Sequence, residues 1–261
     1  MRIATWNING VKARLDTLLG WLGAVRPDVA LLQETKSHDD AFPTAPFEDL
    51  GYNLALHGQK GFNGVAILSK LPLEDVTRGL PGDPDDDQCR FIEAVISVGR
   101  GAAIRVASLY LPNGNPLGSD KFDYKLAWTE RLESLIRDRL RLEEALVLGG
   151  DYNIIPEPRD ARFPENWSAD ALFQPQPRMQ WRRLLSLGLT DAVRAAAPLS
   201  DLYTFWDYQA GAWQKNNGIR IDHFLRSPQA ADRMVGVSID KGIRAAEKPS
   251  DHVPVILELE A

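Results

Sequence analysis

The chain has 261 residues, of which 44% are apolar and 25% are charged. At roughly 150 residues per domain, this length allows one large domain or two small ones. The composition is close to that of an average globular protein, and it excludes a disordered chain, a collagen-like repeat and a disulfide-rich scaffold.

The net charge of −6 argues, taken alone, against a nucleic-acid partner, because proteins that bind phosphate backbones usually present a basic surface. Net charge is a weak argument, however. A site can hold several carboxylates around a divalent cation and still be flanked by local arginines and lysines.

The cysteine content and the apolar stretches indicate the compartment. The single cysteine, Cys89, cannot form an intramolecular disulfide, which fits a reducing environment. The first eight residues have the pattern of a strand, so we expect no secretory leader. The densest apolar stretch, Leu18–Val25, is far shorter than the roughly 20 residues of a membrane span. We therefore predict a cytoplasmic protein with no membrane partner.

Short apolar runs of β character recur along the chain. We expect strands at Arg2–Ile8, Asp28–Leu32, Gly64–Leu68, Phe91–Val98, Ile104–Leu111, Ala145–Leu148, Ile219–Leu225, Val235–Ile239 and Val253–Leu259. Helical spacing of leucines predicts helices around Leu15–Leu22, over about Phe122–Leu142, and from Trp181 toward Gly188. Strands and helices interleaved without strict βαβ alternation predict two packed sheets flanked by helices.

Polar side chains stand where several of these strands end or begin. They are Asn7, Glu34, Tyr110, Asp151, Asn153, Asp222, Asp251 and His252. Each one alone fits a turn, a surface charge or a half-buried aromatic residue. Taken together they favour a site, because a carboxylate beside an apolar core is costly unless it is paired or coordinates a metal.

The residue types in this set suit magnesium, which prefers oxygen ligands and retains several waters. Oxygens are offered by Asn7, Glu34, Asp151, Asn153 and Asp251. His252 is the one nitrogen ligand in the set, and cysteine is absent from it, which argues against a dedicated zinc site. Asp151 and Asn153 would point to the same side of an extended segment. Asp222 is a natural partner for His252, whose tautomer and basicity a carboxylate would set.

At these residues the sequence resembles the exodeoxyribonuclease III family of DNA-repair nucleases, within the endonuclease/exonuclease/phosphatase superfamily. The motifs are Trp6–Gly10, Leu32–Lys36, His57–Gly61, Gly64–Ala66, Tyr110–Gly114, Gly150–Ile154, Arg220–Asp222 and Lys248–His252. The resemblance covers essentially the whole chain. It implies one domain over residues 1–261 with an α+β fold: a four-layer αββα sandwich, similar to deoxyribonuclease I, in which helices flank two packed mixed β-sheets.

The resemblance also implies an activity. Members of this family cleave phosphodiesters of duplex DNA with Mg²⁺, for which Mn²⁺ can substitute. They remove nucleotides from 3′ ends, clear blocked 3′ termini and cut on the 5′ side of abasic sites. The expected partner is therefore double-stranded DNA with abasic sites or 3′ ends, and we expect a monomer.

Roles are implied residue by residue. Glu34 and Asn7 correspond to metal-site residues, with Asp251 as a further ligand. Asp151 corresponds to the acid/base residue and Asn153 to a transition-state stabiliser. The dyad is Asp222–His252, and the active-site tyrosine is Tyr110. Which residue is the general base stays open between Asp151 and the His252–Asp222 pair. Tyr152 and His223 should face away from the site.

For DNA recognition, the resemblance implies that Phe205 and Trp206, with Ile219 or Ile221, line a pocket for a flipped-out baseless sugar. Packing in the core is the alternative role for the aromatic segment Tyr203–Tyr208. We expect phosphate contacts from Arg90, Asn113 and Lys121. Two other functions remain open: a phosphatase or phosphodiesterase acting on a small phosphate ester, and a catalytically silent relative that binds nucleic acid.

Overall fold

The computed structural model describes residues 1–99, 102–197 and 202–260. Its first sheet contains β1 (Arg2–Asn7), β2 (Val29–Gln33), β3 (Asn53–His57), β4 (Val65–Ser69), β11 (Met234–Ile239) and β12 (Val255–Leu259). Its second sheet contains β5 (Leu73–Arg78), β6 (Phe91–Gly99), β7 (Ala102–Tyr110), β8 (Leu146–Asp151), β9 (Thr190–Asp191) and β10 (Asp222–Arg226).

Both sheets are mixed and share one plan. The strand orders are β11-β12-β1-β2-β4-β3 and β5-β6-β7-β8-β10-β9. The central pair of each sheet, β1 with β2 and β7 with β8, is parallel, and the other pairings are antiparallel. Parallel neighbours end at the same edge, so residues at their carboxyl ends come together.

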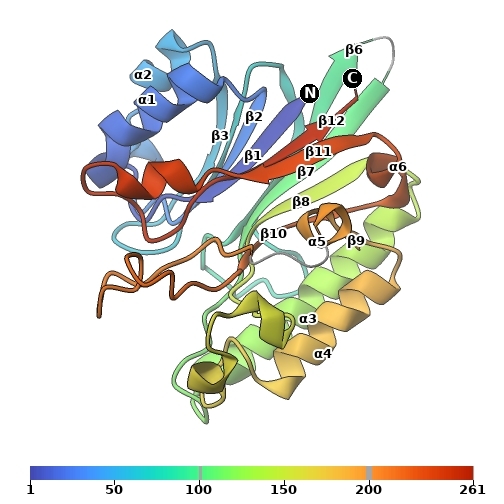
Figure 1. Cartoon of the computed structure of the whole chain (residues 1–261). Coiled ribbons are helices and arrows are strands. Elements are labelled where there is room, and N and C mark those ends of the chain that lie inside the picture. The colour runs from blue at the N-terminus through green and yellow to red at the C-terminus, as the bar shows by residue number, and fades with distance from the viewer. Residues whose placement is uncertain (100–101, 198–201, 261) are drawn as a thin grey trace.

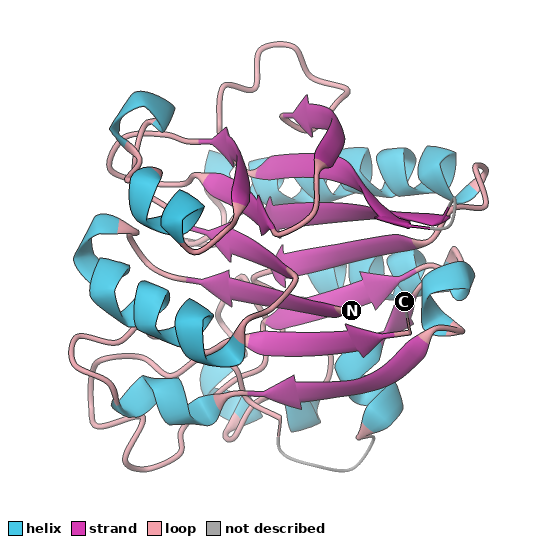
Figure 2. Ribbon diagram, turned by 90° about the horizontal axis from the view of Figure 1, so that it is seen from above, coloured by secondary structure: helices cyan, strands magenta, loops and turns pink. Residues whose placement is uncertain are grey.

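Helices cover the outer face of each sheet. On the first sheet lie α1 (Leu15–Val25) and α2 (Ala45–Asp49), and on the second lie α3 (Asp120–Leu140) and α4 (Pro175–Ser186) (Figure 1). The short helices α5 (Ala192–Ala196) and α6 (Pro228–Ala231) pack beside β10. Seen from above, helices flank the strands on both sides (Figure 2). The predicted four-layer αββα sandwich is confirmed.

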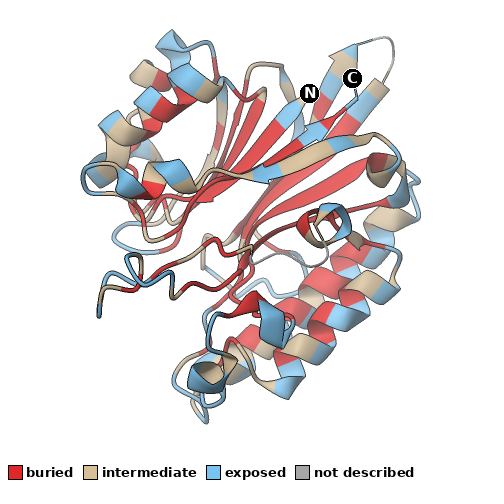
Figure 3. Cartoon of the chain, viewed as in Figure 1, coloured by how far each residue is buried: buried red, intermediate tan, exposed pale blue. Residues whose placement is uncertain are grey.

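The apolar core lies in three layers that follow the alternation of the strands. Residues such as Leu31, Val106 and Val147 meet between the sheets, and their neighbours face the helices. Trp6 packs under α1, and Leu148 packs under α3 and α4. The central strands are buried along most of their length (Figure 3). A polar side chain between the two sheets is therefore shielded from water except near the ends of the strands.

The nine predicted strands are present, but three further strands were missed: β3, β5 and β9. All three are edge strands of their sheets. Edge strands commonly carry charges that prevent unwanted pairing, and β5 has the sequence Leu-Glu-Asp-Val-Thr-Arg. The strand predicted at Ile219–Leu225 starts later than expected, at Asp222, because Ile219 makes only isolated bridges to Ala161 and Phe205.

Candidate active site

The register of the second sheet lines up three of the predicted residues. Tyr110 pairs with Asp151 across β7 and β8, and Asp151 pairs with Asp222 across β8 and β10. By the alternation of their strands, all three side chains belong to the face that meets the first sheet. Strand pairing alone therefore places a phenol and two carboxylates side by side.

Close approach of the two sheets below Asp151 depends on Gly149. A Cβ atom at Gly149 would lie 2.7 Å from Cδ1 of Leu31 in the first sheet and 2.5 Å from Phe224. Real Cβ atoms do not approach other atoms this closely, so a larger residue would displace the side chains of Leu31 and Phe224. Gly149 thus leaves room for the packing below the site.

From the first sheet, Asn7 ends β1 and Glu34 follows β2. The Nδ2 group of Asn7 donates hydrogen bonds to Oε1 of Glu34 at 2.8 Å and to Oδ2 of Asp151 at 2.9 Å. The Oδ1 atom of Asn7 accepts from the backbone N–H of Asn9 at 3.0 Å. Asn7 therefore links the two sheets through its nitrogen, while its oxygen accepts from the Asn9 N–H.

His252 and Asp222 form the predicted buried pair, with 2.8 Å between Nδ1 and Oδ2. The other ring nitrogen, Nε2, lies 3.7 Å from Oδ2 of Asp151. Burial alone would lower the pKa of His252, but the carboxylates of Asp222 and Asp151 outweigh it and raise that pKa. The geometry thus favours an imidazolium held between two carboxylates.

Asp151 is completely buried. It accepts from Asn7 on Oδ2 and from the backbone N–H of Asn153 on Oδ1, at 2.9 Å. Burial raises the pKa of Asp151, and the neighbouring charge of Asp222 adds to this, whereas His252 and the hydrogen bonds oppose it. The net pKa is raised, so this carboxylate holds a proton more readily than a free aspartate.

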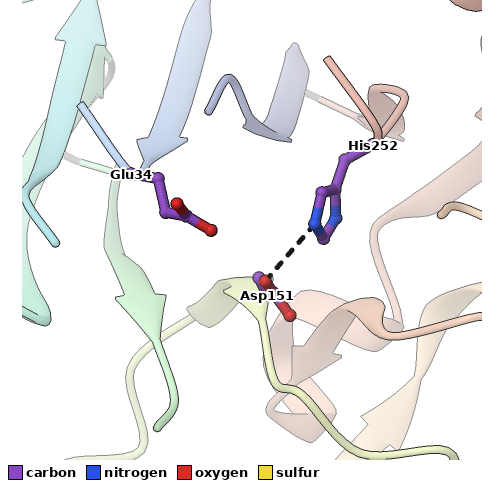
Figure 4. A group of neighbouring side chains, drawn as sticks. All are labelled: Glu34, Asp151 and His252. Carbon is purple, nitrogen blue, oxygen red and sulfur yellow. Dashed lines mark ion pairs between the residues drawn. The ribbon is translucent and has the colours of Figure 1, made fainter. Parts of the chain in front are cut away.

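Glu34, Asp151 and His252 bring one ligand atom each to within 4.8 Å of one another (Figure 4). Burial would raise the pKa of Glu34, but hydrogen bonds from Asn7 and Lys36 lower it overall, so Glu34 is ionised. Two carboxylates, with a histidine whose other nitrogen is already engaged, suit a hard divalent cation. Oxygens of Glu34 and Asp151 are the donors in this group that suit such a cation.

Lys36 was missed by the sequence analysis, although it belongs to the motif Leu32–Lys36. Its Nζ lies 2.8 Å from Oε2 of Glu34 and also reaches Oδ1 of Asn9. The ammonium balances part of the negative charge that the carboxylates gather. A lysine two residues after a buried-strand carboxylate was the signal available in the sequence.

Asp251 lies outside the cluster. Its Oδ1 accepts from Nδ2 of Asn9 at 3.1 Å and from Oγ of Ser250 at 3.3 Å. The structure therefore does not bring Asp251 together with Glu34 and Asp151 as a direct ligand.

Asn153 reaches the site by a different route from the one expected. Its φ of 47° is left-handed, so the segment after Asp151 is not extended. The Nδ2 group of Asn153 donates to the carbonyl of Leu111 at 2.9 Å, and its Oδ1 accepts from Nδ2 of Asn113 at 3.2 Å. The turn, rather than strand alternation, keeps Asn153 beside Asp151.

Tyr110 and Arg90 support each other at the rim. The Arg90 guanidinium stacks on the Tyr110 ring at 4.8 Å, and its Nη1 donates to the Tyr110 carbonyl at 3.2 Å. Burial, together with the charges of Glu34 and Asp151, raises the pKa of Tyr110, so its hydroxyl stays protonated. Arg90 remains half-buried rather than fully free to meet a phosphate.

Lys125, which lies on the buried face of α3, was not predicted from the sequence. Its Nζ donates to the backbone carbonyls of Asn113 at 2.9 Å and Asn153 at 2.6 Å. Burial lowers the pKa of Lys125 to about 7 despite the charges of Asp151 and Asp170. By contrast, Asn113 and Lys121, two of the predicted phosphate contacts, are exposed.

The predicted apolar pocket is only partly at the site. Phe205 is half-buried, and its ring lies 4.9 Å from that of His252. Ile219 and Ile221 are buried in one cluster against which Phe205 packs. Trp206, in contrast, has an exposed fraction of 0% and packs against Trp213. The structure does not bring Trp206 into the site, because consecutive residues of an extended segment face opposite ways.

Tyr152 and His223 face away from the site, as predicted. Both pack against Trp181 of α4, with ring centroids 5.4 and 4.5 Å from it. His223 also contacts Arg220, with 2.9 Å between Nδ1 and Nη1. These residues belong to the helix-facing layer.

Comparison with known proteins adds to this geometry. The model of the endonuclease/exonuclease/phosphatase family matches residues 4–252. Exodeoxyribonuclease III of Haemophilus influenzae is 36% identical over 266 aligned positions, covering 99% of this chain and 99% of that protein. DNA repair nuclease APEX1 of Danio rerio is 31% identical, covering 99% of this chain and 82% of that protein.

Solved structures are similar along the whole chain. An AP endonuclease from Archaeoglobus fulgidus has a TM-score of 0.94 at 37% identity, covering 100% of both chains. The 3′-5′ exonuclease NExo from Neisseria meningitidis has a TM-score of 0.94 at 40% identity, again covering 100% of both chains. A structure of the 3′ phosphatase NExo from Neisseria contains a product DNA hairpin.

Among the helices described for this chain, none combines the length and apolarity required to cross a membrane.

Proposed function

We propose that this chain, which belongs to the endonuclease/exonuclease/phosphatase family and within it is a nuclease of the exodeoxyribonuclease III group, repairs duplex DNA in the cytoplasm. It removes nucleotides from 3′ ends, clears blocked 3′ termini and cuts on the 5′ side of abasic sites. Residues 1–261 act as one domain and as a monomer. The relatives that support this proposal are named as exodeoxyribonucleases, an AP endonuclease and a 3′ phosphatase.

One observation carries the proposal: both sheets deliver acidic and basic groups to a single point. Glu34 comes from the first sheet, Asp151 comes from the second, and Asn7 hydrogen-bonds both of them. The imidazole of His252 stands next to Asp151, with Asp222 behind it. A catalytically silent binding protein or a purely structural sheet edge gains nothing from this buried charge, which is costly to hold.

The cation that suits these donors is Mg²⁺, with Mn²⁺ as a substitute. Oxygens of Glu34 and Asp151 would hold it. When bound, the ion would neutralise a non-bridging phosphate oxygen and the developing charge on the leaving oxygen. Asn7, whose nitrogen bonds both carboxylates, would fix the spacing of these two ligands.

Proton transfer falls to Asp151. As the new bond from the water oxygen to phosphorus forms, the carboxylate accepts a proton from that water. As the bond to the 3′ oxygen breaks, the same proton passes to the leaving oxygen. Asp151 suits this role because it is held in place by Asn7 and the Asn153 N–H, with Nε2 of His252 3.7 Å away.

His252 acts as a donor rather than as the base. Its pKa is raised by Asp222 and Asp151, so the ring carries a proton on Nε2 that it can direct at a phosphate oxygen. Tyr110 and Asn153 lie beside Asp151 and add neutral donors for the transition state. Arg90, Asn113 and Lys121 contact flanking phosphates of the duplex.

The first test is cleavage of a 5′-labelled duplex oligonucleotide that carries one abasic-site analogue. In magnesium we expect a single cut immediately 5′ of the analogue, and in EDTA we expect none, because the carboxylates alone cannot neutralise the phosphate. Products are resolved by denaturing electrophoresis. Asp232→Asn, an exposed change next to α6, serves as the matched control and should behave as wild type.

The other outcomes are informative. Laddering from the 3′ end alone would restrict the chain to exonuclease activity. Binding without cleavage in either condition would contradict the proposal and favour the silent binding protein. Hydrolysis of a small phosphate ester with the duplex intact would favour the phosphatase alternative.

Phe205 provides a second prediction, on abasic-site recognition. Phe205→Ala should lower the rate of abasic-site cutting about tenfold or more relative to 3′ nucleotide removal, because it removes the apolar ring beside His252 where we propose that the baseless sugar binds. Trp206→Ala should instead lower the free energy of unfolding by about 3–5 kcal/mol and reduce both activities together, because Trp206 is buried in the core. Both rates are measured on the same duplex. Equal losses in Phe205→Ala would show that Phe205 only supports His252.

A further inference from the structure

Lys125 is a buried amine whose hydrogen bonds go to backbone carbonyls rather than to carboxylates. Its side chain lies on α3 with an exposed fraction of 0%. The hydrogen-bond acceptors of Nζ, within the described residues, are the main-chain carbonyls of Asn113 and Asn153. A buried amine is expensive to desolvate, and a methionine or leucine would fill the same volume at lower cost. The polar end must therefore contribute something that packing does not.

The two carbonyls belong to the loops that follow Tyr110 at the end of β7 and Asp151 at the end of β8. One loop follows β7 and carries Asn113, and the other follows β8 and carries Asn153. The loops are already joined by one side-chain contact, from Nδ2 of Asn113 to Oδ1 of Asn153 at 3.2 Å. Lys125 adds a second connection between the loops, because its Nζ donates to a backbone carbonyl in each of them.

The second loop needs such a tie because of its backbone. Asn153 has a φ of 47°, a left-handed conformation that costs free energy for any residue with a Cβ atom, although asparagine tolerates it better than most. In this conformation its N–H donates to Oδ1 of Asp151 at 2.9 Å. The hydrogen bond from Lys125 to the Asn153 carbonyl holds the turn on its other side.

The first loop is shaped around the lysine stem. Gly114 has a φ of 88°, and a Cβ atom there would lie 2.6 Å from Cδ of Lys125. The loop therefore passes directly over the side chain with no room for a larger residue. Lys125 and Gly114 fit together as parts of one tightly packed unit.

We propose that Lys125 is a positioning residue that joins the loops after β7 and β8 and so holds the Asn153 amide beside Asp151 before DNA arrives. Lys125 touches neither the phosphate nor the metal site and acts through Asn153. The inference rests on the proposed function in one respect only, the role of Asn153 in the transition state. Both the amine and the ammonium of Lys125 can donate the two hydrogen bonds, so its protonation state does not matter here.

The central test is Lys125→Met, which keeps the length of the side chain and removes its donors. We expect kcat for cleavage of the abasic duplex to fall about 10- to 100-fold, because small displacements of a positioned group cost this much. KM should change less than about twofold, since the loss is confined to the transition state. Leu132→Ala, a buried change on the same helix, is the matched control and should lower thermal stability without this drop in kcat below its unfolding range.

A double-mutant cycle separates positioning from general damage. If Lys125 acts through the Asn153 side chain, adding Lys125→Met to Asn153→Ala should lower kcat by less than about threefold more. Losses that multiply in full would overturn the proposal. Should Lys125→Met not fold, Gly114→Ala displaces the same stem while keeping the amine, and it should give the same pattern of kcat and KM.

A readout independent of activity uses hydrogen exchange of the metal-free protein. Lys125→Met should speed exchange at residues 111–115 and 152–155 relative to Leu132→Ala, with β12 unchanged in both. Unchanged exchange in these two loops would overturn the proposal even if kcat falls. If the wild-type protein does not cleave DNA, the proposed function fails, and the exchange experiment still decides whether Lys125 ties the loops.

Discussion

Replacing Asp151 with asparagine is expected to lower kcat by about 10²–10⁴-fold, the usual contribution of a positioned acid or base. Asparagine has nearly the same shape, but its one oxygen can accept only one of the two hydrogen bonds that Asp151 accepts on separate oxygens, from Asn7 and from the Asn153 N–H. It cannot take a proton from water at neutral pH. Single-turnover cleavage of the abasic duplex in magnesium measures the effect directly, free of product release.

Duplex affinity should stay within a few-fold in the same variant, because Asp151 is buried and contributes no contact to flanking phosphates. Fluorescence anisotropy of a labelled duplex in EDTA checks this without turnover. Asp232→Asn again controls for loss of one negative charge. A near-wild-type rate in Asp151→Asn would refute the assignment, whereas equal losses of rate and affinity would indicate a disturbed site.

Most of the fold could be predicted from the sequence because alternation and helical spacing are local signals. The central strands are long apolar runs, and the helices carry clear leucine spacing. The edge strands could not be predicted, because a strand such as β5 does not alternate: Leu73 and Val76 are three residues apart, and both pack on the core only because the register shifts between Glu74 and Thr77. Its pairing partner β6, rather than its own composition, makes it a strand.

The candidate site divides in the same way. Asp151 and Asp222 were predictable because each adjoins an apolar strand, and strand register then made them neighbours. Trp206 packs in the core, the alternative that the sequence left open, because an aromatic cluster does not reveal which of its members points inward. Lys125 gave no signal, because a lysine in a charged helix is usually solvated, and only the tertiary fold buries it.

The orientation of the Asn7 amide could not be predicted from strand register. The sequence placed it at the end of a strand, and the structure places it there. Its amide can offer either an oxygen or a nitrogen to the site. In the structure the oxygen accepts from the Asn9 N–H, and the nitrogen donates to the two carboxylates. Such a local turn is set by neighbours that composition and spacing do not identify.

Replacing Arg220 is expected to have a large effect on stability. Its Nε donates to Asp160 and its Nη1 to Asp191, both at 2.7 Å, and the group is almost completely buried. Arg194 also pairs with Asp160. Arg220→Met should lower the free energy of unfolding by about 3–5 kcal/mol, because it removes the Arg220 charge from buried Asp191 and leaves Asp160 with Arg194 alone. Thermal and urea unfolding at pH 7 measure this loss.

The matched control is Arg141→Met, which removes an arginine from an exposed pair with Asp138 and should cost less than about 1 kcal/mol. The pH dependence gives a second check. Burial would raise the pKa of Asp160, but Arg220 and Arg194 lower it, so its contribution is present at pH 7 and fades as pH falls below about 4. The stability gap between wild type and Arg220→Met should therefore narrow toward acid pH. A gap that stays constant would mean that Arg220 stabilises the fold by packing rather than by its charge.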